Sequence, residues 1–394
     1  MNATTTACPS CGSSGLERFF ELQGVPTNSC ILLSSREEAL AYPRGEVALG
    51  FCRTCGFITN TSFDPRLTEY SRRYEETQGF SGTFNAFHRD LAQRLIERYD
   101  LHGKDVLEIG CGKGEFIVLL AELGGNRGVG FDPGYREERT TSTAAAQVRF
   151  IKDLYSDKYA EYKADFVCCK MTLEHIQPTA EFIETVRRAI GDGPKTVVFF
   201  QVPEVTRILR DCAFEDIYYE HCSYFSPGSL ARLFRRSGFD VIGLDVAYAD
   251  QYLMIEARPS MDTQTTPLPE EDDLAQLTRY VAEFPAKCAK MLDVWRERIT
   301  ERAARGERIV LWGSGSKGVA FLTTLGVGAH VEYAVDINPY RHGYFMPMTG
   351  QRIVAPAFLS EYRPDCVIIM NPVYRAEIER SLDGMELTPA ILAL

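Results

Sequence analysis

The chain has 394 residues and a formal net charge of −11, from 43 Lys and Arg against 54 Asp and Glu. At roughly 100–200 residues per domain, this length predicts two or three domains, and the acidic balance disfavours binding to nucleic acid. No run of about 18 apolar residues occurs, so we expect no membrane-spanning helix. The N-terminus also lacks the basic start and apolar run of a signal peptide. We therefore expect a soluble, cytoplasmic protein. Nothing in the sequence determines its oligomeric state.

Four of the twelve cysteines form two closely spaced pairs near the N-terminus. Cys8 with Cys11, and Cys52 with Cys55, each fit the pattern C-x₂-C-G, in which the glycine lets the backbone turn back toward a metal. A cytosolic chain keeps its thiols reduced, so this spacing indicates metal rather than disulfides. Four thiolates complete a closed, structural zinc site. We expect residues 1–65 to form a small zinc-binding domain.

The rest of the chain reads as two α/β units joined by helices. Residues 66 to about 100 have helical periodicity, with one apolar face made of Phe84, Phe87, Leu91, Leu95 and Ile96. From residue 105, strands and helices alternate, which predicts a parallel sheet covered by helices on both faces. A polar linker then precedes a helical segment, in which we expect a break or kink at Pro285. The predicted units are 66–257 and 307–394, with the linker and helices at 258–306.

A first glycine-rich turn connects an apolar strand to an apolar helix. Gly110, Gly112 and Gly114 let the backbone pass close to a ligand. The next strand ends at Asp132, where a ribose diol would lie. This pattern, E-x-G-C-G-x-G, resembles motif I of the class I S-adenosylmethionine-dependent methyltransferases rather than the dinucleotide fingerprint.

The resemblance to class I methyltransferases implies a set of cofactor-binding residues. Glu108 and the turn flank the methionine and ribose parts of the cofactor, and Asp132 holds the ribose hydroxyls. Asp153 matches the acid that contacts the adenine amino group. The segment after the fourth strand lies beside the sulfonium in such enzymes. The implied cofactor-binding set is Glu108, Gly110, Cys111, Gly112, Asp132, Asp153 and Leu173, and His175 faces the reactive methyl group.

A third segment, residues 214–226, is dense in side chains that titrate or donate hydrogen bonds. Histidine accepts a proton near neutral pH, a carboxylate raises its basicity, and tyrosine can stabilise an enolate. Taken alone, a segment rich in tyrosine is more often packing than a site. Its sequence Y-x-E-H-x-x-Y-F-S spans Tyr218, Glu220 and His221.

This segment, the cysteine pairs and the C-terminal α/β unit together resemble the sugar C-methyltransferases of deoxysugar biosynthesis. The resemblance implies a zinc-binding domain, a class I methyltransferase domain and a C-terminal Rossmann-like domain. It implies methylation of a nucleotide-linked 4-keto-dideoxysugar at C3. His221 is then the general base, with Tyr218 and Glu220 beside it and His175 after the fourth strand. A further tyrosine falls on Tyr74 or Tyr70, in a stretch that matches the family only loosely.

A second glycine-rich turn, from Gly313 to Gly318, matches G-x-G-x-x-G literally and is followed by Asp336. This pattern favours a dinucleotide, but the family resemblance implies that the C-terminal domain holds the nucleotide-sugar. Substrate phosphate, bound NAD(P) and no ligand remain open for this turn. The predicted substrate-binding residues are Ser314, Ser316, Lys317, Asn338 and Arg341.

Three other functions remain open from the sequence. An S-adenosylmethionine-dependent O- or N-methyltransferase of another small molecule would need less help from a base. A non-catalytic protein that binds the cofactor would tolerate loss of His221. A nucleotide-binding dehydrogenase would use the second turn for NAD(P). The sugar, the nucleotide and the stereochemistry of methylation are not specified by the sequence.

Overall fold

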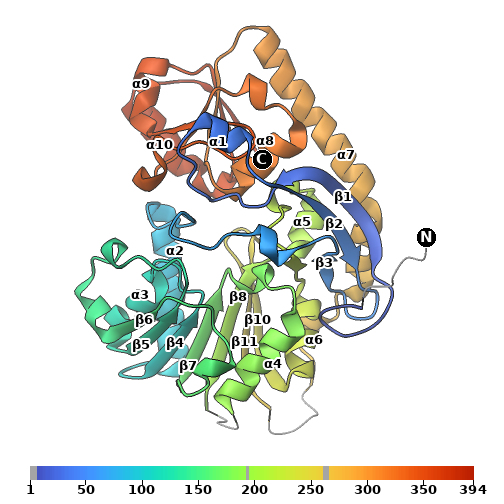
Figure 1. Cartoon of the computed structure of the whole chain (residues 1–394), viewed down its shortest axis with the longest axis vertical. Helices are drawn as coiled ribbons and strands as arrows, with labels where there is room; N and C mark the ends of the chain where they lie inside the picture. Colours follow the sequence, from blue (N-terminus) through green and yellow to red (C-terminus); the bar gives the residue numbers. More distant parts are fainter. Residues whose placement is uncertain (1–6, 192–194, 261–265) are drawn as a thin grey trace.

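A computed structural model describes residues 7–191, 195–260 and 266–394. The chain folds around three β-sheets (Figure 1). In this view the C-terminal sheet lies at the top, the central sheet at the bottom, and the N-terminal strands along one side. Within the described ranges, no helix has the length and apolar character needed to cross a bilayer.

The N-terminal sheet is antiparallel and includes a strand from the middle of the chain. Its order is β1-β2-β3-β9. The bounds are β1 Glu17–Pro26, α1 Arg36–Leu40, β2 Arg44–Phe51, β3 Ile58–Asn60 and β9 Ser223–Tyr224. Because β9 begins two residues after His221, this sheet holds one end of the segment that carries the predicted base.

The central sheet has the order β10-β11-β8-β7-β4-β5-β6. Its strands are β4 Asp105–Ile109, β5 Arg127–Phe131, β6 Val148–Ile151, β7 Phe166–Lys170, β8 Val197–Pro203, β10 Phe239–Ala247 and β11 Tyr252–Pro259. Six of these strands run in the same direction, and β11 runs antiparallel to both of its neighbours, β8 and β10. The prediction of a parallel sheet was wrong for this edge, because the turn at 248–251 is too short for a parallel crossover.

Helices cover both faces of the central sheet, because its parallel strands carry apolar side chains on both sides. Alternate residues, such as Val106 and Leu107, enter different hydrophobic clusters. One face packs against α2 and α3, and the other against α4 and α6. The helices are α2 Gly82–Tyr99, α3 Glu115–Gly124, α4 Thr179–Ile190, α5 Val205–Asp211 and α6 Pro227–Arg236.

The C-terminal sheet is wholly parallel, with the order β14-β13-β12-β15-β16. Its strands are β12 Ile309–Trp312, β13 Tyr333–Val335, β14 Arg352–Val354, β15 Cys366–Ile369 and β16 Ala390–Ala393. Its helices are α8 Ser316–Leu325, α9 Leu359–Tyr362 and α10 Arg375–Gly384. The second glycine-rich turn therefore lies between β12 and α8, at the carboxyl end of the strand.

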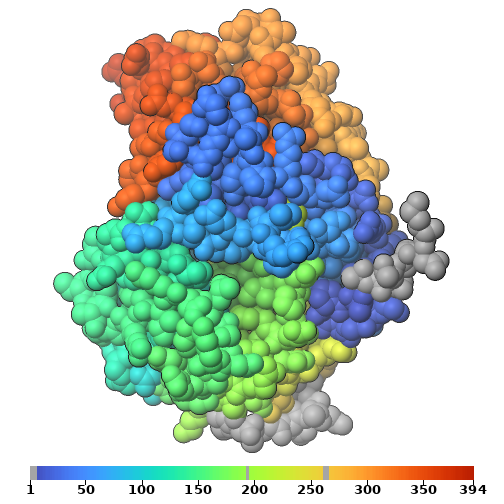
Figure 2. Space-filling view, in the orientation of Figure 1, coloured from blue at the N-terminus to red at the C-terminus, as the bar shows by residue number. Residues whose placement is uncertain are grey.

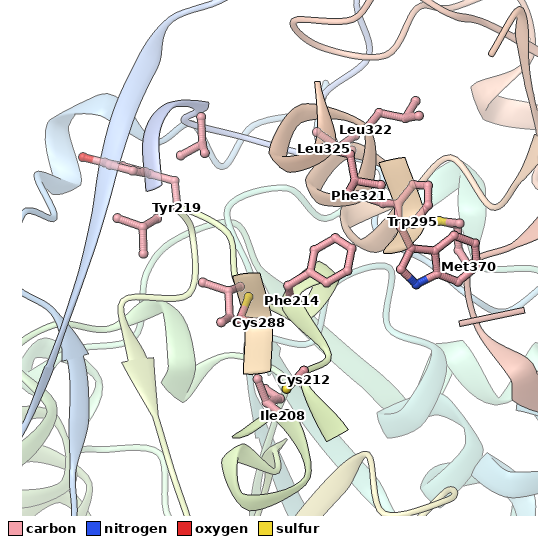
Figure 3. Close-up of a cluster of buried hydrophobic side chains, with 14 of the residues drawn as sticks. Ile208, Cys212, Phe214, Tyr219, Cys288, Trp295, Phe321, Leu322, Leu325 and Met370 are labelled. Atoms are coloured by element: carbon pink, nitrogen blue, oxygen red, sulfur yellow. The ribbon is translucent and has the colours of Figure 1, made fainter. Parts of the chain in front are cut away.

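The long helix α7, Leu274–Ala304, runs through Pro285 without ending, so the expected break is wrong. The side chains on either side of the proline, Phe284 and Cys288, are fully buried in the largest hydrophobic cluster, and this packing holds the helix together across the missing N–H. Figure 3 shows part of that cluster, where Trp295 of α7 meets Phe321 of α8 edge to face at 5.3 Å. The cluster also contains residues of β2, α5 and β15 and so connects the N-terminal and C-terminal sheets with a helix of the central unit.

Residues 68–81 are not helical, although the periodicity predicted a helix from residue 66. Their backbone groups bond to the N-terminal segment instead: Glu75 N–H donates to Cys30 O, and Leu32 N–H donates to Arg73 O, both at 2.9 Å. Figure 2 shows this stretch, between β3 and α2, crossing the face of the molecule between the central and C-terminal parts. The predicted linker contains a 3₁₀ turn at Pro269–Glu271, and its residues 261–265 lie outside the described ranges.

Candidate active site

A cavity of about 470 Å³ lies between the two α/β units, beside the N-terminal part of the chain. Both α/β sheets contribute residues at or just beyond the carboxyl ends of their strands, where such sheets bind ligands. These residues are Met171, Pro203, Trp312, Asp336 and Met370. The N-terminal part contributes Cys30, and the stretch before α2 contributes Tyr74. The volume falls in the range of small-molecule and cofactor pockets, about 300–1,000 Å³.

His221 lines this cavity with only 3% of its surface exposed. Its Nε2 lies 2.8 Å from the hydroxyl of Tyr218, which also lines the cavity. Burial, helped by the neighbouring His175, lowers the pKa of His221 well below its usual value. The imidazole is therefore neutral and holds a lone pair that can accept a proton.

The segment from Ile217 to Cys222, here called the His221 loop, is fixed by the N-terminal part. The buried carboxylate of Glu220 accepts hydrogen bonds from Ser29 N–H at 2.8 Å and from the Asn28 amide at 3.1 Å. Two residues later, Cys222 O accepts from Asn60 N–H at 2.9 Å and from the Thr59 hydroxyl at 2.8 Å. Glu220 thus points away from the cavity, whose described lining does not include it.

His175 lies beside His221, with the two rings 4.9 Å apart. Its Nδ1 is 3.0 Å from Glu220 O and 2.9 Å from the Tyr70 hydroxyl. Burial lowers the pKa of His175 to about 4, so it too is neutral. The two candidate tyrosines separate in space: Tyr74 lines the cavity, whereas Tyr70 contacts His175 behind it.

Glu174 is a cavity residue that the sequence reasoning did not single out. Its side chain is 1% exposed, yet within the described chain neither carboxylate oxygen has a hydrogen-bond partner. Oε1 lies 3.9 Å from Nε2 of His221. Burial raises the pKa of Glu174 to about 8. Its place directly before His175, after strand β7, was the available signal.

Lys317 of the second glycine-rich turn lines the same cavity and is paired with the central domain. Its Nζ lies 2.5 Å from Asp216, which also pairs with Arg207. These cations lower the pKa of Asp216 to about 2 although the side chain is buried, so it remains ionised. All three side chains line the cavity, and Glu215, whose pKa burial raises to about 7, lies 4.0 Å from Nζ of Lys317. When Glu215 is protonated, the two cations beside Asp216 can accept a further anion.

The other predicted substrate-binding residues lie in the same crevice but are held by internal contacts. Ser314 donates both its N–H, at 3.0 Å, and its hydroxyl to Asp336. Arg341 donates to Ser314 O, and the Asn338 amide donates to Glu75 at 2.9 Å. The cavity lining includes Ser316, Asn338 and Arg341 but, among described residues, not Ser314. The second glycine-rich turn is therefore held in place by its hydrogen bonds to Asp336.

The first glycine-rich turn forms a cradle that side chains would fill. Gly110 and Gly112 have φ of +69° and +54°, and a Cβ on Gly110 would lie 2.0 Å from the Thr172 hydroxyl oxygen. Asp132 accepts from Gly112 N–H at 2.9 Å. Burial raises the pKa of Asp132 to about 6 and that of Glu108 to about 7. Two buried carboxyl groups around a bare backbone fit a ligand that carries an ammonium and a diol.

Residues 110–114 of the first glycine-rich turn do not line the cavity in the described chain, but residues in contact with this turn do. Lys113 donates to Tyr74 O at 2.9 Å and pairs with Glu76, and both Tyr74 and Glu76 line the cavity. Cys111 and Leu173 are buried next to the turn and at the end of β7. Asp153 lies after β6, adjacent to Asp132, but its carboxylate is held by Lys158 and Tyr159.

The four N-terminal cysteines converge as their spacing predicted. Cys8 Sγ lies 3.7 Å from Cys55 Sγ, Cys11 Sγ lies 3.6 Å from Cys52 Sγ, and all four sulfurs lie within 4.8 Å of one another. A tetrahedral site with Zn–S bonds of about 2.3 Å has edges of about 3.8 Å. The donor set and its spacing therefore fit a structural zinc ion.

Comparisons with known proteins agree with the two α/β units. A family model described as a methyltransferase domain matches residues 83–244, and one described as a C-methyltransferase C-terminal domain matches residues 256–388. The chain is 25% identical over 344 residues to C-methyltransferase NovU of Streptomyces niveus, covering 83% of this chain and 80% of that protein.

Two further similarities are shorter. Ubiquinone biosynthesis O-methyltransferase of Proteus mirabilis (strain HI4320) is 30% identical over 122 residues, 28% of this chain and 49% of that protein. Among solved structures, the N,N-8-amino-8-demethyl-D-riboflavin dimethyltransferase RosA of Streptomyces davawensis has 18% identity and a TM-score of 0.36, covering 44% of this chain and 55% of that chain.

Proposed function

We propose a substrate and a catalytic base for this chain, which belongs to the S-adenosylmethionine-dependent C-methyltransferases. The substrate is a nucleotide-linked keto-deoxysugar, and methylation occurs at the carbon next to its ketone. His221 is the general base. The observation that carries this proposal is a neutral, buried imidazole at a cavity bounded by both α/β sheets.

Methylation at carbon requires a general base, because the acceptor carbon must first lose a proton. A carbon next to a ketone gives up its proton only to a positioned base and when the developing oxygen charge is stabilised. The C–H proton passes to Nε2 of His221, and its bonding electrons move into the ketone as an enolate. The Tyr218 hydroxyl, 2.8 Å from that nitrogen, is placed to donate to the enolate oxygen. A positioned base contributes about 10²–10⁴-fold in rate.

The supporting groups act through position. Glu220 ties the His221 loop to Asn28 and Ser29, and His175 lies against the imidazole with its tautomer set by Glu220 O. We assign the family's further tyrosine to Tyr74, because it lines the cavity. These side chains exclude water from the base and limit its motion.

The second glycine-rich turn supplies the contacts to the nucleotide. We propose that the substrate's diphosphate meets Lys317 and the N–H groups at the start of α8, with Ser314, Ser316, Asn338 and Arg341 shaping the crevice. The pairing of Lys317 with Asp216 supports this assignment, since it holds the ammonium group at the cavity wall.

The cofactor occupies the first turn in this proposal. Glu108, Gly110, Cys111, Gly112, Asp132, Asp153 and Leu173 hold it, and S-adenosylmethionine, when bound, supplies the electrophilic methyl group. Zinc at Cys8, Cys11, Cys52 and Cys55 is structural and takes no part in transfer. The functional units are those predicted from the sequence, 1–65, 66–257, 258–306 and 307–394.

Incubation with methyl-labelled S-adenosylmethionine and a panel of nucleotide-linked 4-keto sugars tests the proposal. We expect label in the sugar, on the carbon next to the ketone, as located by NMR of the product. The same sugars without the nucleotide are the matched control and should react much more slowly. Label on oxygen or nitrogen, or equal rates without the nucleotide, would contradict the proposal.

A further inference from the structure

The buried carboxyl group of Glu174 is unusual because it has no hydrogen-bond partner within the described chain. Buried polar atoms are almost always hydrogen-bonded, because leaving one unpaired destabilises the folded state. Both oxygens of Glu174 are buried without a partner in the described chain, and the side chain faces the cavity. Nδ1 of His221 is also buried and, within the described chain, has no hydrogen-bond partner. Glu174 Oε1 lies 3.9 Å from the other ring nitrogen, Nε2, which contacts the Tyr218 hydroxyl.

Glu174 and His221 attract each other strongly once His221 has gained a proton and Glu174 has lost one. An imidazolium buried beside a carboxylate is stabilised far more than an isolated imidazolium, because the low local dielectric strengthens their attraction. Desolvation alone disfavours a buried imidazolium. The reaction proposed above creates this cation on His221, so the base needs a counter-charge at that moment.

We propose that Glu174 is the positioning residue that supplies the negative counter-charge to His221 during proton abstraction. This inference rests on the proposed function, since it assumes that His221 is the base. Glu174 first releases its proton to solvent. The substrate C–H proton then moves to His221, leaving a carboxylate beside an imidazolium. Loss of the imidazolium proton to solvent after methyl transfer restores the pair.

A metal ion is a less suitable partner for these side chains. Glu174, His175 and His221 offer ligand atoms within 4.8 Å of one another. A tetrahedral zinc site with bonds of about 2.1 Å needs ligand atoms about 3.4 Å apart. The Glu174–His221 separation of 3.9 Å exceeds this, and Nε2 already contacts the Tyr218 hydroxyl.

The groups that face the pair leave Glu174 as its titrating member near pH 8. Tyr70 and Tyr218 have pKa values raised well above the usual by burial, as does Cys169 at the end of β7. Burial raises the pKa of Cys222 to about 12.

Three charged or titratable groups complete the surroundings. His175 is neutral, Asp216 is ionised, and Lys317 lines the same cavity. Outside the pair, Glu108 and Glu215 have pKa values raised by burial to about 7. A variant at position 174 therefore has to separate the contribution of Glu174 from theirs.

The test is the pH profile of kcat/KM for Glu174→Gln against the wild type. Because ionisation of Glu174 increases as pH rises through about 8, the wild-type value should climb between pH 6 and 8 and then level off. Glu174→Gln keeps the shape of the side chain and breaks no hydrogen bond. We expect it to lower kcat about 10–100-fold, leave KM within about threefold, and lose the part of the rise that ends near pH 8.

Glu271→Gln is the matched control, a buried carboxyl paired with Arg235 on the far side of α6, and it should keep the wild-type profile. Glu174→Asp, which retains a carboxylate, should recover part of the rise and part of kcat. A Glu174→Gln protein with wild-type kcat and an unchanged profile overturns the inference. If that variant fails to fold, a wild-type profile without a rise ending near pH 8 overturns it instead.

Failure of the proposed function has a different signature. If His221→Ala still exchanges the substrate proton, the base is elsewhere and both assignments fall. If His221→Ala abolishes exchange while Glu174→Gln is unaffected, only the inference about Glu174 falls.

Discussion

The two walls of the cavity are held by different kinds of contact. The His221 loop is fixed from the N-terminal part, through backbone bonds to Cys222 and uncharged donors on the Glu220 carboxylate. The Lys317 turn, residues 313–318, meets the central domain through the ion pair of Lys317 with Asp216. A base must keep one position to be effective, so directional bonds suit it. A phosphate-binding lysine acts as a point charge, and one carboxylate can hold it ready.

This difference predicts that damage to the two walls affects different kinetic constants. Loosening the His221 loop should lower kcat, because it misplaces the base. Weakening the Lys317 turn should raise KM for the nucleotide-linked substrate, because it removes a binding contact. The changes below run from the largest expected effect to the smallest.

Cys52→Ser should have the largest effect, because Cys52 directly follows β2 and lies on the connection to β3, the strand that pairs with β9. We expect one zinc per wild-type chain and less than half an equivalent in the variant, by metal analysis. Tm should fall by about 5–10 °C, and activity should be largely lost. Cys212→Ser, at a buried cysteine outside the cluster, should retain the metal. Equal zinc content in both variants would contradict zinc binding by the four N-terminal cysteines.

Glu220→Gln should lower kcat about 100-fold with little change in KM. The amide has one acceptor oxygen where the carboxylate has two, so it cannot accept from both Ser29 N–H and the Asn28 amide. The His221 loop therefore shifts, and a displacement of about 1 Å can cost 10²-fold in rate. Steady-state kinetics with saturating cofactor measure both constants. A raised KM with unchanged kcat would mean that Glu220 binds substrate rather than positioning the loop.

Lys317→Met should raise KM for the nucleotide-linked substrate about 10–100-fold and leave kcat nearly unchanged. This range corresponds to the loss of one charged hydrogen bond, about 1.5–3 kcal/mol. Calorimetry with the free nucleoside diphosphate should show the same loss of affinity, and cofactor affinity should stay constant. Wild-type binding of the diphosphate by the variant would place the nucleotide elsewhere.

The last prediction is that NADH does not bind to the second glycine-rich turn. The acid of the second turn, Asp336, already accepts from Ser314 and from Asn338 N–H, so it is satisfied without a ribose diol. We expect NADH fluorescence to be unchanged on mixing with the protein. Saturable quenching that nucleoside diphosphate does not reverse would favour the dehydrogenase alternative for this turn.

The sequence predicted the parts of the fold that local patterns encode. The cysteine spacing anticipated the convergence of the four thiols, and the apolar runs anticipated the strands of both α/β units. Errors arose where tertiary contacts override local preference: residues 68–81 bond to the N-terminal segment, and buried neighbours carry α7 through Pro285. The pairing of β3 with β9 also joins residues far apart in the chain, which no local pattern reveals.

The sequence did not reveal Glu174 as a cavity residue for a comparable reason. His221 and Tyr218 stand in one motif, and the structure places them in contact. Glu174 was passed over because a glutamate next to a histidine is an ordinary pair of residues. Its unusual property, two buried oxygens without partners, exists only after the chain has folded. Likewise, only the fold distinguishes Tyr74 at the cavity from Tyr70 behind His175.

Proton exchange at the substrate carbon tests the role of His221 most directly. The wild type and His221→Asn are each incubated in deuterated water with the nucleotide-linked keto sugar and S-adenosylhomocysteine, which cannot donate a methyl group. NMR should show the wild type exchanging the proton next to the ketone, and the variant, with unchanged affinity for S-adenosylhomocysteine, exchanging it at least about 100-fold more slowly. Exchange by the variant at the wild-type rate would contradict the assignment of His221 as the base.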